Sequence, residues 1–138
     1  MPRPVDAIRI AVRALNDGDL DGYLGHFDAS CQRWALGFDQ PLTLADVEAG
    51  FRDLDAAFDG LRLDEDLLFG DKRFACARWR MRGIHVRDYL GVAPTGRSID
   101  VETCEVYEFT DGCVVTSWLY GDVLGQLVGQ IAPEGDGT

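Results

Sequence analysis

The chain has 138 residues, 46% of them hydrophobic, and its 24 acidic residues against 13 basic ones give a net charge of −11. This length fits one domain with a hydrophobic core of its own. An acidic surface keeps a protein soluble and repels phosphate groups, so neither nucleic acid nor an anionic membrane is expected as a partner. No apolar run approaches the roughly 18 residues of a membrane span, and no charged-then-apolar leader opens the chain. We therefore expect a cytoplasmic protein.

No pattern in the sequence is typical of a metal site. The cysteines form no C-x-x-C pair and do not cluster with either histidine; they are Cys31, Cys76, Cys104 and Cys113, and the histidines are His26 and His85. We expect four free thiols and no bound metal.

The first sixty residues are predicted to be largely helical. After Pro2 and Pro4, one apolar stripe at helical spacing ends at Asn16-Asp17-Gly18, and a second runs from Leu20 to Phe27. A third helix is expected to begin at Thr43, because Thr43 and Asp46 resemble a capping box with Asp in place of Glu. The stripes are Ile8, Val12 and Leu15; Leu20, Tyr23, Leu24 and Phe27; and Val47, Phe51, Leu54 and Phe58, before Gly60.

The rest of the chain is predicted to be mainly strands. A short strand begins at Leu61 and a long one covers residues 73–85, while residues 99–109 and 114–120 flank Asp111-Gly112, a strong hairpin signal. One more short helix fits residues 124–131. Helices followed by a meandering sheet favour an α+β class, with one domain over residues 1–133 and a loose tail over 134–138.

The hairpin turn predicts which side chains share a face. With Asp111-Gly112 as a two-residue turn, Glu105 should lie opposite Trp118, Thr103 opposite Tyr120, and Val101 opposite Asp122. One face would then mix aromatic rings with two acids, as in a small-molecule pocket. Its expected members are Val101, Thr103, Glu105, Tyr107, Trp118, Tyr120 and Asp122.

Asp122 is the residue that most needs an explanation, because a carboxylate at the end of an aromatic strand costs free energy unless it has a partner or a function. Two roles stay open: capping the helix that follows, or acid–base catalysis. Glu105 either faces the same pocket or pairs with an arginine of a neighbouring strand. A third set, Arg78, Arg80 and Arg82, is predicted to form a solvated or interface face.

Five segments resemble SnoaL-like polyketide cyclases, which belong to the nuclear-transport-factor-two-like superfamily. They are the Arg78-Trp79 strand that ends in Gly83-Ile84-His85, the connection over residues 90–97, Phe109-Thr110-Asp111-Gly112, Trp118 with Asp122 four residues on, and Gly125-Gln126-Leu127. The resemblance covers residues 5 to 133. It implies a curved antiparallel sheet wrapped by the N-terminal helices to form a cone-shaped pocket.

The resemblance also implies an activity: cofactor-independent intramolecular aldol closure of a polyketide-like substrate, as in antibiotic biosynthesis. Asp122 corresponds to the family's general acid/base and His85 to its Gly-x-His histidine. Glu105 and Glu108 depart from the family, whose members commonly place a histidine or arginine near the end of this strand. We predict Asp122, His85 and Glu105 as catalytic residues, and as substrate-binding residues Trp118, Tyr120, Tyr107, Thr103, Trp79, Tyr23 and Trp34.

Other functions remain open on the same fold. Dehydration, isomerisation or epoxide opening would make this protein a different lyase, isomerase or hydrolase, and a non-catalytic ligand-binding module belongs to another class. The expected partners are a small hydrophobic substrate and a second copy of the chain, paired through the convex face of the sheet. No cofactor is required for the predicted chemistry.

Overall fold

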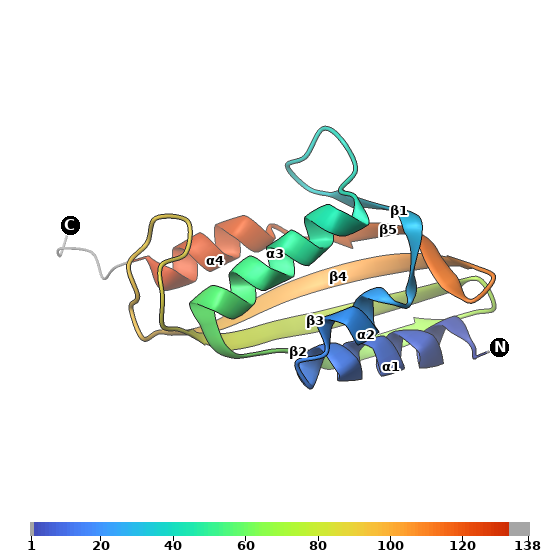
Figure 1. Cartoon of the computed structure of the whole chain (residues 1–138), viewed down its shortest axis with the longest axis horizontal. Helices are drawn as coiled ribbons and strands as arrows, with labels where there is room; N and C mark the ends of the chain where they lie inside the picture. The colour runs from blue at the N-terminus through green and yellow to red at the C-terminus, as the bar shows by residue number, and fades with distance from the viewer. Residues whose placement is uncertain (1, 133–138) are drawn as a thin grey trace.

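The computed structural model describes residues 2–132, so the predicted tail over residues 134–138 lies outside the described residues. The elements in chain order are α1 (Pro4–Asn16), α2 (Leu20–Leu24), β1 (Phe27–Ala35), α3 (Leu44–Ala57), β2 (Phe58–Gly70), β3 (Phe74–His85), β4 (Ser98–Thr110), β5 (Cys113–Tyr120) and α4 (Val123–Ile131). Helices α1, α2 and α3 lie on one face of a curved sheet, and α4 lies beside β4, beyond the end of β5 (Figure 1). The predicted α+β class is confirmed.

The five strands are ordered β1-β5-β4-β3-β2. All neighbours are antiparallel except β1, which pairs parallel to β5. This edge strand was not predicted, because the apolar spacing from Leu20 to Phe27 suggested a continuous helix. Helix α2 instead ends at Leu24, and Phe27 pairs with Val114. Strand pairing thus overrides the local helical pattern.

The third predicted helix is close to the observed α3. Thr43 Oγ1 accepts a hydrogen bond from the Asp46 N–H, and the Asp46 carboxylate accepts one from the Thr43 N–H, which completes the predicted capping box. The helix ends at Ala57, so Phe58 opens β2 instead of closing the helix. Strand β2 is also much longer than the short strand predicted near Leu61.

The predicted hairpin forms, but its predicted register is wrong. Thr110 pairs with Cys113 and Phe109 with Val114, as expected, whereas Glu108 pairs with Thr116 instead of Val115. The skipped residue, Val115, forms a β-bulge that shifts all later pairs by one position. A shift of one residue moves each side chain to the other face of the sheet.

The shifted register changes the partners of the aromatic residues. Trp118 lies opposite Val106, and Tyr120 lies opposite Cys104. Glu105 faces Leu119, so the inner face of β5 carries Ser117 and Leu119 in place of the predicted aromatic rings.

Two apolar clusters fill the space between the sheet and the helices. In the larger one, α1 and α2 pack over Ala75, Ala77 and Trp79. In the smaller one, Leu127 and Ile131 of α4 pack with residues that include Met81, Ile99 and Val101. The inner face of the sheet is therefore covered along both halves of its length.

Strand β5 ends at Tyr120, and beyond this point helix α4 takes its place beside β4. The Gln126 amide accepts a hydrogen bond from the Glu102 N–H and donates one to the Glu102 carbonyl. Gln130 does the same with the N–H and carbonyl of Asp100. The edge of β4 therefore keeps its backbone groups paired, which blunts an otherwise open strand edge.

Candidate active site

A polar cluster lies inside the larger apolar cluster, on the inner face of the sheet. Strand register places Arg33 of β1 beside Ser117 of β5, and Ser117 opposite Tyr107 of β4. Glu105 lies two residues from Tyr107 on the same face of β4. Helix α2 adds Tyr23 from above, so four elements supply this cluster.

Arg33 and Glu105 form its central ion pair. Arg33 Nη2 lies 3.0 Å from Glu105 Oε2, and the two side chains are 11% and 5% exposed. The same nitrogen donates to Glu105 Oε1 and to the Tyr23 hydroxyl, at 3.3 Å each. Burial lowers the pKa of the Arg33 guanidinium, but the facing Glu105 carboxylate outweighs this and raises it. Arg33 therefore stays charged.

Two aromatic residues extend the network across the sheet. The Tyr107 hydroxyl donates to Glu105 Oε1 at 3.3 Å and accepts from Trp79 Nε1 at 3.0 Å. Burial, with the nearby Glu105 charge, raises the pKa of Tyr107 well above its ordinary value. Burial also raises the pKa of Tyr23 to about 12, although Arg33 opposes the shift. Both phenols thus remain protonated donors at neutral pH.

The structure separates the predicted substrate-binding residues into two sets. Trp79, Thr103 and Tyr107 share the inner face with Glu105, and Tyr23 is buried above them. Trp34 and Trp118 are register partners on the outer face, where Tyr120 also lies. Trp34 is 42% and Tyr120 57% exposed. The prediction that Trp118 and Tyr120 share a pocket with Glu105 is wrong because of the bulge at Val115, and Trp34, expected as a pocket or core wall, lies on the outer face of the unpredicted strand β1.

Asp122 lies outside the polar cluster. It is exposed and forms the N-cap of α4, where its Oδ1 accepts a hydrogen bond from the Gly125 N–H at 2.9 Å. A Cβ at Gly125 would collide with this carboxylate, so glycine is required for the cap in this form. The expectation that Asp122 and Glu105 face one cavity is therefore wrong, and the capping role is the one present in the fold.

His85 is fully buried at the far end of β3. Its Nδ1 accepts a hydrogen bond from the Thr95 N–H at 3.2 Å, and its Nε2 has no hydrogen-bond partner. Glu105 pairs with Ala77, eight positions from His85 along β3. At about 3.3 Å per residue, the two side chains lie roughly 26 Å apart along the strand. They do not share one pocket, contrary to the prediction.

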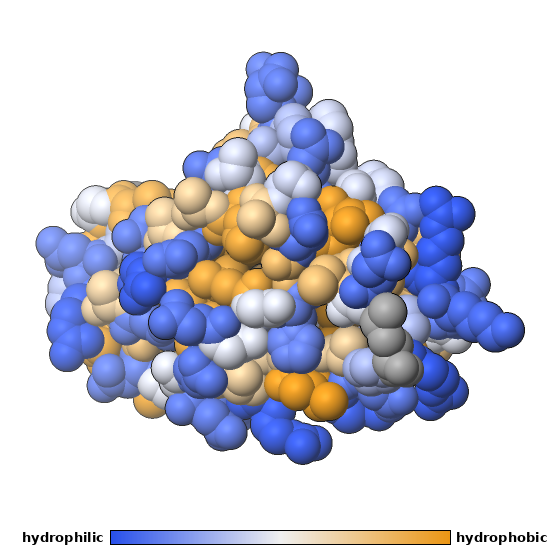
Figure 2. Space-filling view, turned by 45° about the vertical axis from the view of Figure 1, so that its right-hand side comes forward, coloured by the Kyte–Doolittle hydropathy of each residue, from blue (hydrophilic) through white to orange (hydrophobic). Residues whose placement is uncertain are grey.

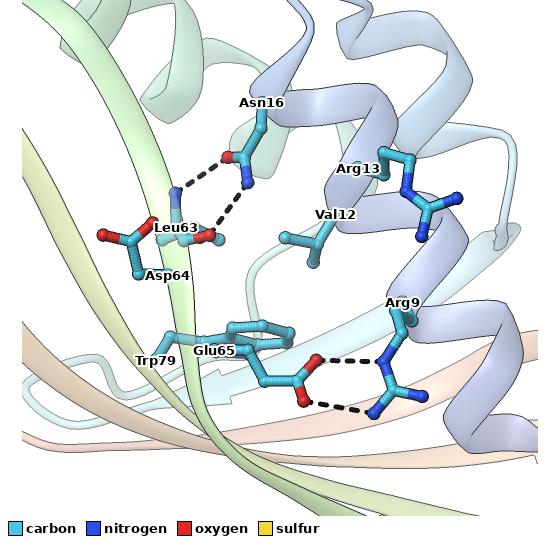
Figure 3. Close-up of a pocket in the computed structure, with 8 residues that line it drawn as sticks. All are labelled: Arg9, Val12, Arg13, Asn16, Leu63, Asp64, Glu65 and Trp79. Atoms are coloured by element: carbon cyan, nitrogen blue, oxygen red, sulfur yellow. Dashed lines mark hydrogen bonds and ion pairs between the residues drawn. The ribbon is translucent and has the colours of Figure 1, made fainter.

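A groove of about 260 Å³ lies between α1 and β2, with Trp79 of the inner face in its lining (Figure 3). Arg9 bridges to Glu65 through two contacts of 3.1 Å, and Asn16 pairs with the backbone of Leu63. The indole of Trp79 lies at its inner end and donates to Tyr107, so it separates the groove from the Glu105 carboxylate.

Sequence reasoning missed two further groups. Arg33 lies on the unpredicted strand β1, so no pattern related it to Glu105. Asp55 of α3 is exposed but borders a narrow crevice with Phe51 and Met81, where partial burial raises the pKa of its carboxyl against the opposing charge of Arg52. An acidic residue on the apolar side of an amphipathic helix was the signal available for Asp55.

The outer face of the sheet holds the arginine row that was predicted there. Arg78, Arg80 and Arg82 pair with acidic side chains of β2 and β4, among them Asp66 and Asp100.

Within residues 2–132, no group of three or more His, Cys, Asp or Glu side chains could hold a metal ion. No helix in that range is long and apolar enough to cross a membrane.

Comparison with known families agrees with this architecture. The profile of SnoaL-like polyketide cyclases matches residues 5–129. The chain belongs to that family. The predicted resemblance is confirmed, and no curated protein matched the sequence.

Solved structures of the same fold come from several bacteria. AclR, a "putative hydroxylase" from Streptomyces galilaeus, is 23% identical, with 91% of this chain and 92% of that one covered and a TM-score of 0.82. IdmH, a "putative polyketide cyclase" from Streptomyces antibioticus, is 23% identical over 91% and 99%, with a TM-score of 0.79. A "putative polyketide cyclase" from Xanthomonas campestris pv. campestris is 14% identical over 94% and 97%, with a TM-score of 0.81. At these identities the likeness shows the fold alone.

The buried ion pair makes a prediction about stability. Arg33→Met leaves the Glu105 charge uncompensated in the interior and should lower the free energy of unfolding by about 3–5 kcal/mol. The double variant Arg33→Met/Glu105→Met should be more stable than Arg33→Met alone. Urea unfolding measures both, with Arg80→Met as the control, because its partly exposed pairs should contribute at most about 1 kcal/mol. A double variant less stable than Arg33→Met would contradict the pairing.

The buried phenol makes a prediction about alkaline pH. Because the pKa of Tyr23 is about 12 in the folded protein and ordinarily 10, the folded state binds its proton more tightly. The resulting stability is fully present below pH 10 and is lost as the pH rises towards 12. Tyr23→Phe should therefore show a shallower fall of the unfolding free energy over that range, measured by urea unfolding at each pH. An unchanged slope would show that Tyr23 ionises as freely in the folded protein as in the unfolded chain.

Proposed function

We propose that this protein is a cofactor-independent enzyme that closes a ring in a polyketide-like substrate by intramolecular aldol chemistry, with Glu105 as the proton-transfer group. Such a closure removes a proton from a carbon next to a carbonyl and later delivers one to the new alkoxide. A single carboxylate in a dry site can do both. Family membership supports the reaction class, and the burial of Glu105 among aromatic side chains supports its role.

One observation carries the assignment of Glu105 over Asp122. Glu105 Oε2 is buried and contacts Arg33 Nη2 at 3.0 Å as an ion pair, but no donor meets hydrogen-bond geometry on it, so a lone pair remains for a substrate proton. Asp122 is exposed, and its carboxylate already caps α4. The positive charge of Arg33 lies at the same site, where it can offset the negative charge that develops on a substrate oxygen.

Deuterium exchange at carbon tests this proposal without the native substrate. The probe is 2-tetralone, a fused-ring ketone whose protons next to the carbonyl exchange with D₂O once an enolate forms. NMR should show faster exchange with the wild-type protein than in buffer. Glu105→Gln should lower the protein-dependent rate by about 10²–10⁴-fold, because amide nitrogen and oxygen cannot accept this proton.

The matched control is Glu102→Gln, an exposed carboxylate on the opposite face of β4. Glu102→Gln should exchange 2-tetralone at the wild-type rate. If Asp122→Asn abolished exchange while Glu105→Gln did not, the carboxylate implied by the family resemblance would do the chemistry and the present assignment would be wrong. No exchange above buffer with wild-type protein would favour the ligand-binding alternative.

We also propose that the protein acts as a cytoplasmic homodimer through the outer face of its sheet. Trp34, Trp118 and Tyr120 leave apolar surface on β1 and β5, while the neighbouring arginines are already balanced by acids of the same chain. A face with both charges and an apolar end can pair with its own copy. Light scattering after gel filtration should give twice the 15.2 kDa chain mass, and Trp118→Glu should give one. A monomeric wild-type protein would contradict this.

A further inference from the structure

Two hydrogen-bond donors inside the fold have no partner, and they are neighbours. Arg33 Nε–H and Ser117 Oγ–H belong to residues that face each other in the β1–β5 register. Ser117 is 0% exposed, and the Arg33 side chain is 11% exposed. Buried polar groups are nearly always paired, because leaving one unpaired costs free energy. Two such groups side by side therefore need an explanation.

Both donors line one narrow cleft between β1, β5 and the start of α3. Its other walls are mostly apolar and include Phe27, Leu42, Leu44 and Val47. The cleft has no room for a water molecule in this conformation, so solvent does not pair the donors there. A ligand atom can reach them only if the cleft widens.

The segment over residues 36–42 forms part of the wall and stands out from the body of the protein (Figures 1 and 2). It is closed by two backbone hydrogen bonds between Arg33 and Leu42, of 2.9 and 2.7 Å. Leu36 is 67% and Phe38 48% exposed, so few apolar contacts hold its tip against the body. Leu42 is the residue of this segment that lines the cleft, so displacement of the segment would break its bridge to Arg33 and open the cleft while β1 keeps its pairing with β5.

We propose that this cleft receives the oxygen of the substrate carbonyl next to the carbon that loses its proton, and stabilises the enolate. The inference rests on the proposed function. Arg33 Nε–H and Ser117 Oγ–H would both donate to that oxygen, while Arg33 Nη2 keeps its contact with Glu105. A positive donor and a neutral donor on one oxygen favour its anionic form over the ketone.

The proton and electron changes balance within this set of groups. The C–H bond breaks, its proton passes to Glu105 Oε2, and its electron pair moves onto the carbonyl oxygen as the enolate forms. The enolate carbon then attacks a second carbonyl of the same chain, which forms the ring bond, and Glu105 returns the proton to the new alkoxide. The substrate class is therefore a flexible apolar chain with at least two ketone groups.

Binding of 2-naphthol tests the subsite separately from catalysis. Its ionised form has an oxyanion on a flat fused ring, like the enolate of 2-tetralone, and its fluorescence reports binding below and above its ionisation. Wild-type protein should bind the naphtholate at least tenfold more tightly than the neutral form. Ser117→Ala should weaken naphtholate binding by about 10–100-fold, as expected for a hydrogen bond to a charged oxygen, with a smaller effect on the neutral form.

Stability measurements exclude a purely structural explanation. Because the Ser117 hydroxyl is buried without a partner, Ser117→Ala should leave the melting temperature unchanged or raise it while binding falls. Thr116→Val is the matched control, since it removes the hydroxyl of the preceding residue from the outer face. This control should bind naphtholate like the wild type.

Failure of this inference is distinguishable from failure of the proposed function. If Ser117→Ala binds naphtholate as tightly as wild type, or if wild type does not prefer the ionised form, the subsite is wrong even when Glu105→Gln abolishes exchange. If the naphtholate preference depends on Ser117 while 2-tetralone never exchanges, the subsite stands and the proposed catalysis falls.

Discussion

The ion pair between Arg33 and Glu105 is the interaction on which the rest of the site depends. It joins the edge strand β1 to the central strand β4 across β5, inside an apolar cluster where an unpaired charge would be strongly destabilising. Tyr23 and Tyr107 bond to it from opposite sides, and Trp79 fixes Tyr107 in turn. The orientation of four buried polar residues is thus set by one pair. The network is not fully satisfied, because Arg33 Nε and Glu105 Oε2 have no hydrogen-bond partner.

Arg33 also explains why the parallel strand β1 matters for chemistry. Without this strand, the inner face of β5 would present Ser117 with no positive charge beside it. A substrate oxygen that approached Arg33 would draw on the same guanidinium that neutralises Glu105. The carboxylate would then lose part of its counter-charge at the moment when it must accept a proton. Binding and proton transfer are coupled through one side chain in this arrangement.

The fold could be predicted from sequence where local signals and tertiary packing agree. The Thr43 capping box, the stripe of α1 and the Asp111-Gly112 turn each involve neighbours in sequence, and all appear in the structure. The candidate site was less predictable. Its strand register depended on a bulge at Val115, and no residue type in the sequence indicates that bulge. This one bulged residue moved Trp118 and Tyr120 to the outer face.

Whether a site residue could be predicted depended on how far along the sequence its contact partner lies. Glu105 and Tyr107 share one face of β4, as predicted, because strand alternation is a local rule. Arg33 was missed because its partner is 72 positions away and its strand lies at the sheet edge. Asp122 was considered both as a helix cap and as a catalytic acid. Its capping contact, which forms in the structure, was predictable because its partner Gly125 is only three residues away in sequence.

Ser117 shows how a functional group can be recognised by the free energy of folding that it costs. A serine at this position leaves its hydroxyl buried and unpaired, whereas alanine would fill nearly the same space without that penalty. A well-packed interior has no structural reason to keep such a group, and the same holds for the free Nε–H of Arg33. Both donors belong to neighbouring strands and line one cleft, which ties their cost to a common cause. An oxygen that arrives only with the substrate is the partner that accounts for both.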